Sequence, residues 1–178
     1  MIKAPILETD RLVLRPYQRD DFGAVAAMWA EPEVFGHVGA AEPMPPDEVW
    51  AKLLRSAGLW SLVGHGFWAI EGKAEGRLIG EVGFGDRRRA DPRFADLPET
   101  GCAFASFAQG KGYATEAVRA ALAWADTALP GRATLAVIAP ANTASIRVAE
   151  KCGYAEFMRA PSRGRDRIMF KRPFGAAA

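Results

Sequence analysis

The chain has 178 residues, 49% hydrophobic and 25% charged, and its 23 basic and 21 acidic side chains leave a net charge of +2. This length fits one domain, 1–178, and the near-neutral charge argues against a nucleic-acid or membrane partner. The apolar runs are shorter than the ~20 residues of a membrane span, and the N-terminus lacks the apolar core of a signal peptide. Two cysteines, Cys102 and Cys152, are too few for a disulfide framework, so we expect a cytoplasmic protein.

The hydrophobic pattern of the first half predicts two helices and three strands. We expect a strand over 6–15 and a helix from about residue 22 that buries Val25 and Trp29. Residues 31–46 contain four prolines and are expected to form a loop. Asp47 is expected to cap a second helix. The segments 67–71 and 77–84 have the pattern of an antiparallel pair joined by a glycine-containing turn.

The second half alternates strands and helices. The charged segment 86–98 predicts a loop, and 100–106 predicts a strand. Apolar residues recur at helical spacing from Ala114 until Pro130 and Gly131 end the helix. A short strand over 133–138 precedes a helix capped by Asn142, and a final hairpin joins 154–159 to 167–171. The sum is a mixed α/β protein with about seven strands and about four helices.

The connection between the predicted strand 100–106 and the following helix is a candidate phosphate site. It consists of Gln109, Gly110, Lys111, Gly112, Tyr113 and Ala114. Glycines permit close approach to the backbone, and a helix that opens after such a turn presents unpaired N–H groups to an anion. Two other phosphate motifs fail on spacing, because Gly112 stands where a P-loop has Ser or Thr and Thr115 where a dinucleotide fingerprint ends in glycine. A glycine-rich turn that binds nothing is the remaining alternative.

Three segments together resemble one family. The pattern Gln-x-x-Gly-x-Ala at 109–114, the segment from Asn142 to Tyr154 and the segment from Thr9 to Pro16 occur in the order and spacing typical of the GNAT superfamily of N-acetyltransferases. The segment from Thr9 to Pro16 is similar to the first strand of the ribosomal-protein N-terminal acetyltransferase branch. The resemblance spans about residues 7–172 and implies a GNAT-like fold, in which a mostly antiparallel sheet splays where two parallel strands part.

The resemblance implies acetyl-CoA as the acyl donor. The N–H groups of the turn 109–114 would hold its pyrophosphate, and Lys111 would add charge there or simply be solvated. The thioester would lie beside Phe104, Ala105 and Ser106, whose N–H groups would polarise its carbonyl. Asn142 would contact the pantetheine arm, although a helix cap alone also explains this asparagine. A donor with a longer acyl chain stays open.

An amine acceptor has to lose a proton before it can attack, which requires a base. The resemblance favours Glu99 for this role, with Glu81 as the alternative and a solvated carboxylate as the plain explanation of either. Many relatives carry, where this chain has Ala149, a tyrosine that acts as the acid and reprotonates the CoA thiolate. The branch instead uses a serine, which corresponds to Ser145, to reprotonate the thiolate.

We therefore expect an N-acetyltransferase that moves an acetyl group to a primary amine, on a small molecule or a protein N-terminus, by direct attack. Ala149 favours one alternative, a catalytically silent acyl-CoA-binding module of the same fold. No metal site is expected, because His37 and His65 have no cluster of partner ligands in the sequence. The basic run 87–89 suits a solvated loop or an acidic acceptor. A homodimer is expected by analogy alone.

Overall fold

The computed structural model describes residues 4–37, 40–88, 94, 96–162 and 164–176. Its strands are β1 (Leu7–Glu8), β2 (Leu12–Arg15), β3 (Phe67–Gly72), β4 (Arg77–Gly85), β5 (Glu99–Phe104), β6 (Thr134–Ile138), β7 (Ala155–Ser162) and β8 (Arg165–Arg172). Its helices are α1 (Phe22–Trp29), α2 (Pro32–His37), α3 (Pro46–Val63), α4 (Tyr113–Ala128) and α5 (Thr143–Lys151), with short 3-10 turns η1 (Arg19–Asp21) and η2 (Ser106–Ala108). The mixed α/β class is confirmed.

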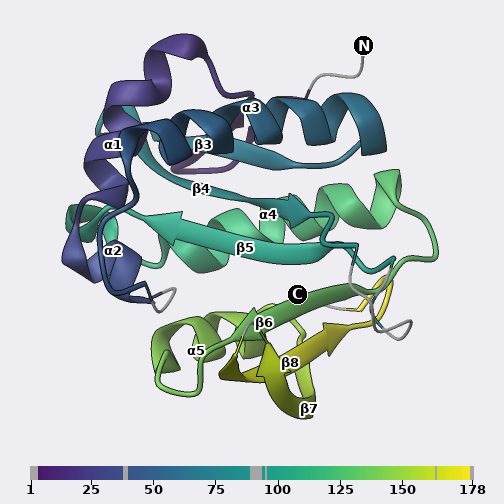
Figure 1. The fold of residues 1–178 in the computed structure, drawn as a ribbon. Helices are drawn as coiled ribbons and strands as arrows, with labels where there is room; N and C mark the ends of the chain where they lie inside the picture. The colour runs from purple at the N-terminus through teal and green to yellow at the C-terminus, as the bar shows by residue number, and fades with distance from the viewer. Residues whose placement is uncertain (1–3, 38–39, 89–93, 95, 163, 177–178) are drawn as a thin grey trace.

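All eight strands form one sheet in the order β1-β2-β3-β4-β5-β6-β8-β7. Every neighbouring pair is antiparallel except β5 and β6. Within the described residues these two strands pair at only two positions, Glu99 with Leu135 and Thr100 with Ala136, and then diverge. Figure 1 shows the result, with β6, β8, β7 and α5 set apart from β1–β5. The expected splay between parallel strands is therefore present.

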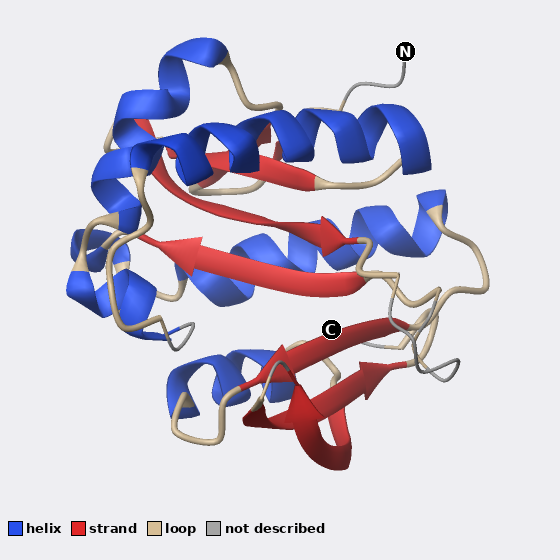
Figure 2. Cartoon of the chain, viewed as in Figure 1, coloured by secondary structure: helices blue, strands red, loops and turns tan. Residues whose placement is uncertain are grey.

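Helices cover both faces of the sheet (Figure 2). The apolar face of α4 packs with Trp68, Phe84 and other fully buried strand side chains, and α5 joins the same core through Ala149. The helices α1, α2 and α3 form a second core against the opposite face, around Val25 and Val49. None of the described helices is both long and apolar enough to cross a lipid bilayer.

Four expectations about elements were wrong. The predicted strand 6–15 is a hairpin, in which β1 and β2 pair through Leu7 with Leu14. The predicted loop 31–46 contains α2, because proline is well tolerated in the first turn of a helix and Pro32 occupies that place. Pro46 likewise opens α3, so Asp47 lies in its first turn and does not cap it. The predicted strand 100–106 ends at Phe104.

Candidate active site

A cleft of about 790 Å³ opens where β5 and β6 diverge. Its lining includes β5 and β6 themselves, the turn before α4 and one face of α5 along the length of that helix. At the narrow end of the cleft, the Tyr154 hydroxyl lies 2.5 Å from the hydroxyl oxygen of Thr100 on β5 and 2.7 Å from that of Thr134 on β6. Tyr154 therefore ties the two strands together just where their backbone pairing ends.

The turn before α4 has the conformation that an anion site requires. Gly110 and Gly112 have φ of +74° and +81°, which favour glycine, and a Cβ on Gly110 would meet no atom within 4 Å. Within the described chain, the N–H groups of residues 110–114 donate no hydrogen bond, because α4 begins at Tyr113 and its first donors have no helical acceptor. A row of unpaired donors at the positive end of a 16-residue helix is a good fit for a pyrophosphate.

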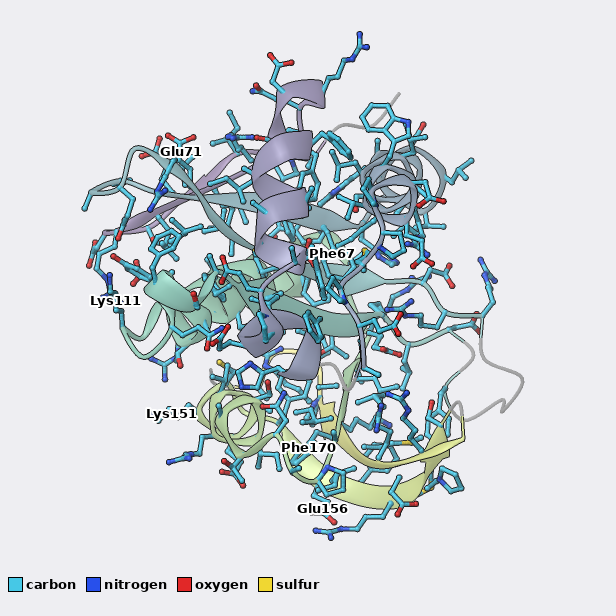
Figure 3. The ribbon with its side chains drawn as sticks, turned by 60° about the vertical axis from the view of Figure 1, so that its left-hand side comes forward. Phe67, Glu71, Lys111, Lys151, Glu156 and Phe170 are labelled. Atoms are coloured by element: carbon cyan, nitrogen blue, oxygen red, sulfur yellow. The ribbon has the colours of Figure 1, made fainter. Side chains whose placement is uncertain are left out.

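The charge of the cleft also suits a polyphosphate. Among the described residues, four basic side chains and one acidic side chain line it: Arg87, Arg147, Lys151, Arg167 and Glu99. Figure 3 shows Lys111 of the turn and Lys151 of α5 on the same side of the molecule. Lys111 is half-exposed and lies 4.0 Å from a carboxylate oxygen of Glu75. The acetyl donor expected from the sequence therefore fits the turn both in geometry and in charge.

The strand before the turn differs from its expected role. Phe104 lines the cleft, whereas Ala105 is buried in the second core and its N–H donates to the Ile79 carbonyl of β4 (3.0 Å). The Ser106 N–H donates to Glu31 Oε2 at 2.6 Å. Since both donors are used by the protein, Ala105 and Ser106 cannot polarise a thioester carbonyl as expected.

The donors that remain on this strand belong to Cys102 and Phe104. Successive strand residues direct their backbone N–H groups to opposite sides, and the Ala105 N–H points to β4. The N–H groups of Cys102 and Phe104 therefore point away from β4, into the space where β6 has diverged from β5. The Gln109 amide folds back and donates to the Phe104 carbonyl at 3.0 Å, which fixes the end of the strand relative to the turn. Burial raises the pKa of the Cys102 thiol to about 12, so this thiol stays protonated and is a poor nucleophile.

Asn142 and Ser145 lie together at the start of α5, on the opposite wall of the cleft. Asn142 caps the helix as expected, since its Oδ1 accepts the Ser145 N–H at 3.0 Å. Its Nδ2 also donates to the carbonyl of His37 at the end of α2 (2.9 Å), so the asparagine bridges the two walls. The Ser145 hydroxyl lines the cleft and has no hydrogen-bond partner among the described residues. Ala149, one turn further, is buried.

The two candidate bases have very different surroundings. Glu99 lines the cleft near its narrow end, with its side chain 15% exposed and the Nε of Arg87 3.6 Å from its Oε1. Glu81 is 3% exposed and lies outside the cleft, where Lys52 Nζ (2.7 Å) and the Tyr17 hydroxyl (2.5 Å) occupy its two oxygens. Burial and the nearby Glu81 charge raise the pKa of Tyr17 well above its usual value. Both oxygens of the Glu81 carboxylate are thus engaged by these two partners.

Several contacts at the cleft escaped sequence reasoning. Glu31, which anchors Ser106, and Arg11, which contacts the turn, are distant in sequence and carry no motif of their own for these contacts. His37 is exposed and lines the cleft. Arg87 and Arg88 pair with acidic neighbours, while Arg89 lies outside the described residues. No group of three or more His, Cys, Asp or Glu side chains in the described chain is arranged to hold a metal ion.

Known proteins share this fold, and some of them share about a third of the sequence. The model of the "Acetyltransferase (GNAT) domain" matches residues 11–155. The chain is 29% identical over 154 residues to the uncharacterized N-acetyltransferase YoaA from Bacillus subtilis, covering 84% of this chain and 82% of the relative. A structure described as a GNAT-family acetyltransferase from Bordetella pertussis has 33% identity and a TM-score of 0.83, over 95% of this chain and 99% of that one.

The ribosomal-protein-S5-alanine acetyltransferase from Vibrio fischeri has the same fold at 20% identity, with a TM-score of 0.76 over 97% of this chain and 98% of that one. The family model covers most of this chain, and the diverging strands β5 and β6, the glycine turn and the capped α5 all lie within the matched residues. The chain therefore belongs to the GNAT acetyltransferase family.

Proposed function

We propose that this protein is a single-domain, cytoplasmic N-acetyltransferase that transfers the acetyl group of acetyl-CoA to a primary amine. One observation carries the proposal: a single cleft is lined by Gly110, Gly112 and Ala114 of the turn, whose N–H groups are unpaired among the described residues, and by Glu99 and Ser145. The turn and Asn142 would hold the donor, and the N–H groups of Cys102 and Phe104 would polarise the thioester carbonyl.

The proposed reaction is direct attack. Glu99 accepts a proton from the amine, itself or through one water, and the free amine attacks the acetyl carbonyl carbon. The C–S bond breaks as the tetrahedral intermediate collapses, and Ser145 donates a proton to the departing sulfur. The extra proton that attack leaves on the nitrogen passes, directly or through water, to the Ser145 oxygen, which restores the hydroxyl and gives the neutral amide. The protonated Cys102 thiol supports a route without an acyl-enzyme. The acceptor is a small-molecule amine or a protein N-terminus, the latter supported by the fold shared with a ribosomal-protein acetyltransferase.

The alternative is a silent acyl-CoA-binding module with the same cleft. The observation in its favour is that Ala149 stands where many relatives carry an acidic tyrosine, and the nearby Tyr154 hydroxyl is already engaged by two threonines. Burial raises the pKa of Tyr154 to about 12. Because Thr100 and Thr134 already engage the Tyr154 hydroxyl, Ser145 is the hydroxyl proposed to donate the proton on this wall of the cleft.

Release of free thiol from acetyl-CoA separates the two functions. The protein is incubated with acetyl-CoA and a panel of amines that includes alkyl amines, amino acids and peptides with free Ala or Ser N-termini. We expect thiol release that requires both protein and one class of amine, with the acetylated amine identified by mass spectrometry. Binding of acetyl-CoA without thiol release above the uncatalysed rate, for every amine, would instead identify the silent module.

A further inference from the structure

The turn before α4 is held from behind by Arg11, which lies between β1 and β2, a hundred residues earlier. Its Nη1 donates to the carbonyl of Lys111 at 2.9 Å. Its Nε and Nη2 lie 2.7 and 2.6 Å from Oε2 of Glu116, in the first turn of α4. The guanidinium also stacks over the Tyr113 ring, 4.6 Å from its centroid. One side chain thus contacts the turn, the ring that follows it and the helix.

The contact with the Lys111 carbonyl sets the direction of a neighbouring donor. Lys111 lies between Gly110 and Gly112, two glycines with positive φ, and such a segment has many alternative conformations. Because a peptide unit is planar and trans, its C=O and N–H point in opposite directions. When Arg11 holds the Lys111 carbonyl on the outer side, the Gly112 N–H is directed to the other side, into the cleft that Gly112 lines.

The contact with Glu116 has an electrostatic consequence. A carboxylate in the first turn stabilises a helix, but it also repels a phosphate that binds to the same N-terminus. Partial burial raises the pKa of Glu116, but hydrogen bonds from Thr9 and Arg11 outweigh burial and hold the pKa below its usual value, so the group is ionised. Its Oε1 accepts from the Thr9 hydroxyl (2.6 Å) and the Arg11 N–H (3.0 Å). The Arg11 guanidinium neutralises this charge next to the proposed phosphate site.

We propose that Arg11 is a positioning residue for the donor. It fixes the turn 110–112 and neutralises the charge of Glu116, so that the unpaired N–H groups of the turn can donate hydrogen bonds to a pyrophosphate. This inference rests on the proposed function, in which the turn binds the pyrophosphate of acetyl-CoA. Arg11 itself touches neither reacting atom, so its effect is expected on donor recognition and not on the acetyl transfer step.

The test compares two donors in wild type and Arg11→Gln. Acetyl-CoA contains the pyrophosphate, and S-acetylpantetheine has the same thioester without any phosphate. For Arg11→Gln we expect kcat/KM with acetyl-CoA to fall about tenfold, through KM, with kcat within about twofold of wild type. With S-acetylpantetheine we expect kcat/KM to change less than about twofold, because that donor makes no contact with the turn. Equal losses with both donors, or no loss with either, overturn the proposal.

Two further variants control for the fold. Arg159→Gln removes a similar Arg–Glu pair on β7, where Nε lies 2.7 Å from Glu156 Oε1. It is expected to leave unchanged the ratio of kcat/KM with acetyl-CoA to kcat/KM with S-acetylpantetheine. If Arg11→Gln does not fold, Arg11→Lys keeps the charge but lacks the fork that holds Lys111 and Glu116 together, and it is expected to lower the ratio by a smaller factor. A wild type that uses both donors equally contradicts the pyrophosphate site itself, whereas a normal wild-type preference that survives in both Arg11 variants contradicts only the role of Arg11.

Discussion

Replacement of Glu99 by glutamine is expected to lower kcat about a hundredfold or more, because the amide keeps the shape of the side chain but cannot accept the proton of the amine. The affinity for acetyl-CoA, measured by calorimetry, is expected to stay within about twofold of wild type, since Glu99 lies at the narrow end of the cleft, away from the turn. The residual activity of Glu99→Gln should rise steeply with pH, because only amine that is already neutral in solution can then react.

Glu81→Gln is the matched comparison, because Glu81 lies on the neighbouring strand and is the other candidate base. Its carboxylate is buried against Lys52, so we expect a loss of about 3 kcal/mol in the free energy of unfolding as that ammonium loses its partner. We expect kcat of the folded Glu81→Gln enzyme to stay within a few-fold of wild type. A large loss of kcat in Glu81→Gln, with Glu99→Gln nearly normal, would reverse the assignment of the base.

Replacement of Gly83 by alanine is expected to destabilise the fold strongly. A Cβ at this position of β4 would overlap the backbone oxygen of Gly66 and the Cα of Phe67, where the neighbouring strand β3 begins, and backbone atoms cannot move aside as a flexible side chain can. We expect a loss of about 3 kcal/mol, which corresponds to a fall in Tm of roughly 10 °C for a chain of this size. Thermal unfolding followed by circular dichroism measures it.

Gly58→Ala serves as the control for Gly83→Ala. Gly58 lies inside α3, and an added Cβ would meet no atom within 4 Å. Alanine has a higher helix propensity than glycine, so this variant is expected to gain about 0.5–1 kcal/mol in the free energy of unfolding. The same substitution should thus have opposite signs at the two positions. Similar destabilisation by both variants would contradict the close approach of backbones at Gly83.

Features set by local sequence were predictable, and features set by distant contacts were not. The glycines of the turn and the Asn142 cap act within a few residues, so their spacing predicted the turn, the start of α4 and the start of α5. The parallel strands and their splay followed from the family resemblance. In contrast, α2 was missed because Pro32 was counted as a helix breaker, although proline suits a first helical turn.

The details of the site depended on pairs far apart in sequence. The Ser106 N–H donates to Glu31, 75 residues earlier, and this contact removes a donor that the sequence alone left free for the thioester. The preference for Glu99 over Glu81 as the proposed base likewise depends on Lys52 of α3, which forms an ion pair with Glu81. No sequence pattern encodes such pairings, because tertiary packing alone brings the two partners together.

Binding of acetyl-CoA to the cleft is the claim on which the rest depends, and thermal unfolding of the wild-type protein with and without acetyl-CoA tests it most directly. At about a hundredfold excess over Kd, a ligand adds roughly 2.7 kcal/mol to the free energy of unfolding, which for this size raises Tm by roughly 5–10 °C. We expect a shift of that size with acetyl-CoA. An unchanged Tm at millimolar acetyl-CoA would contradict the donor site, and with it the roles proposed for Glu99, Ser145 and Arg11.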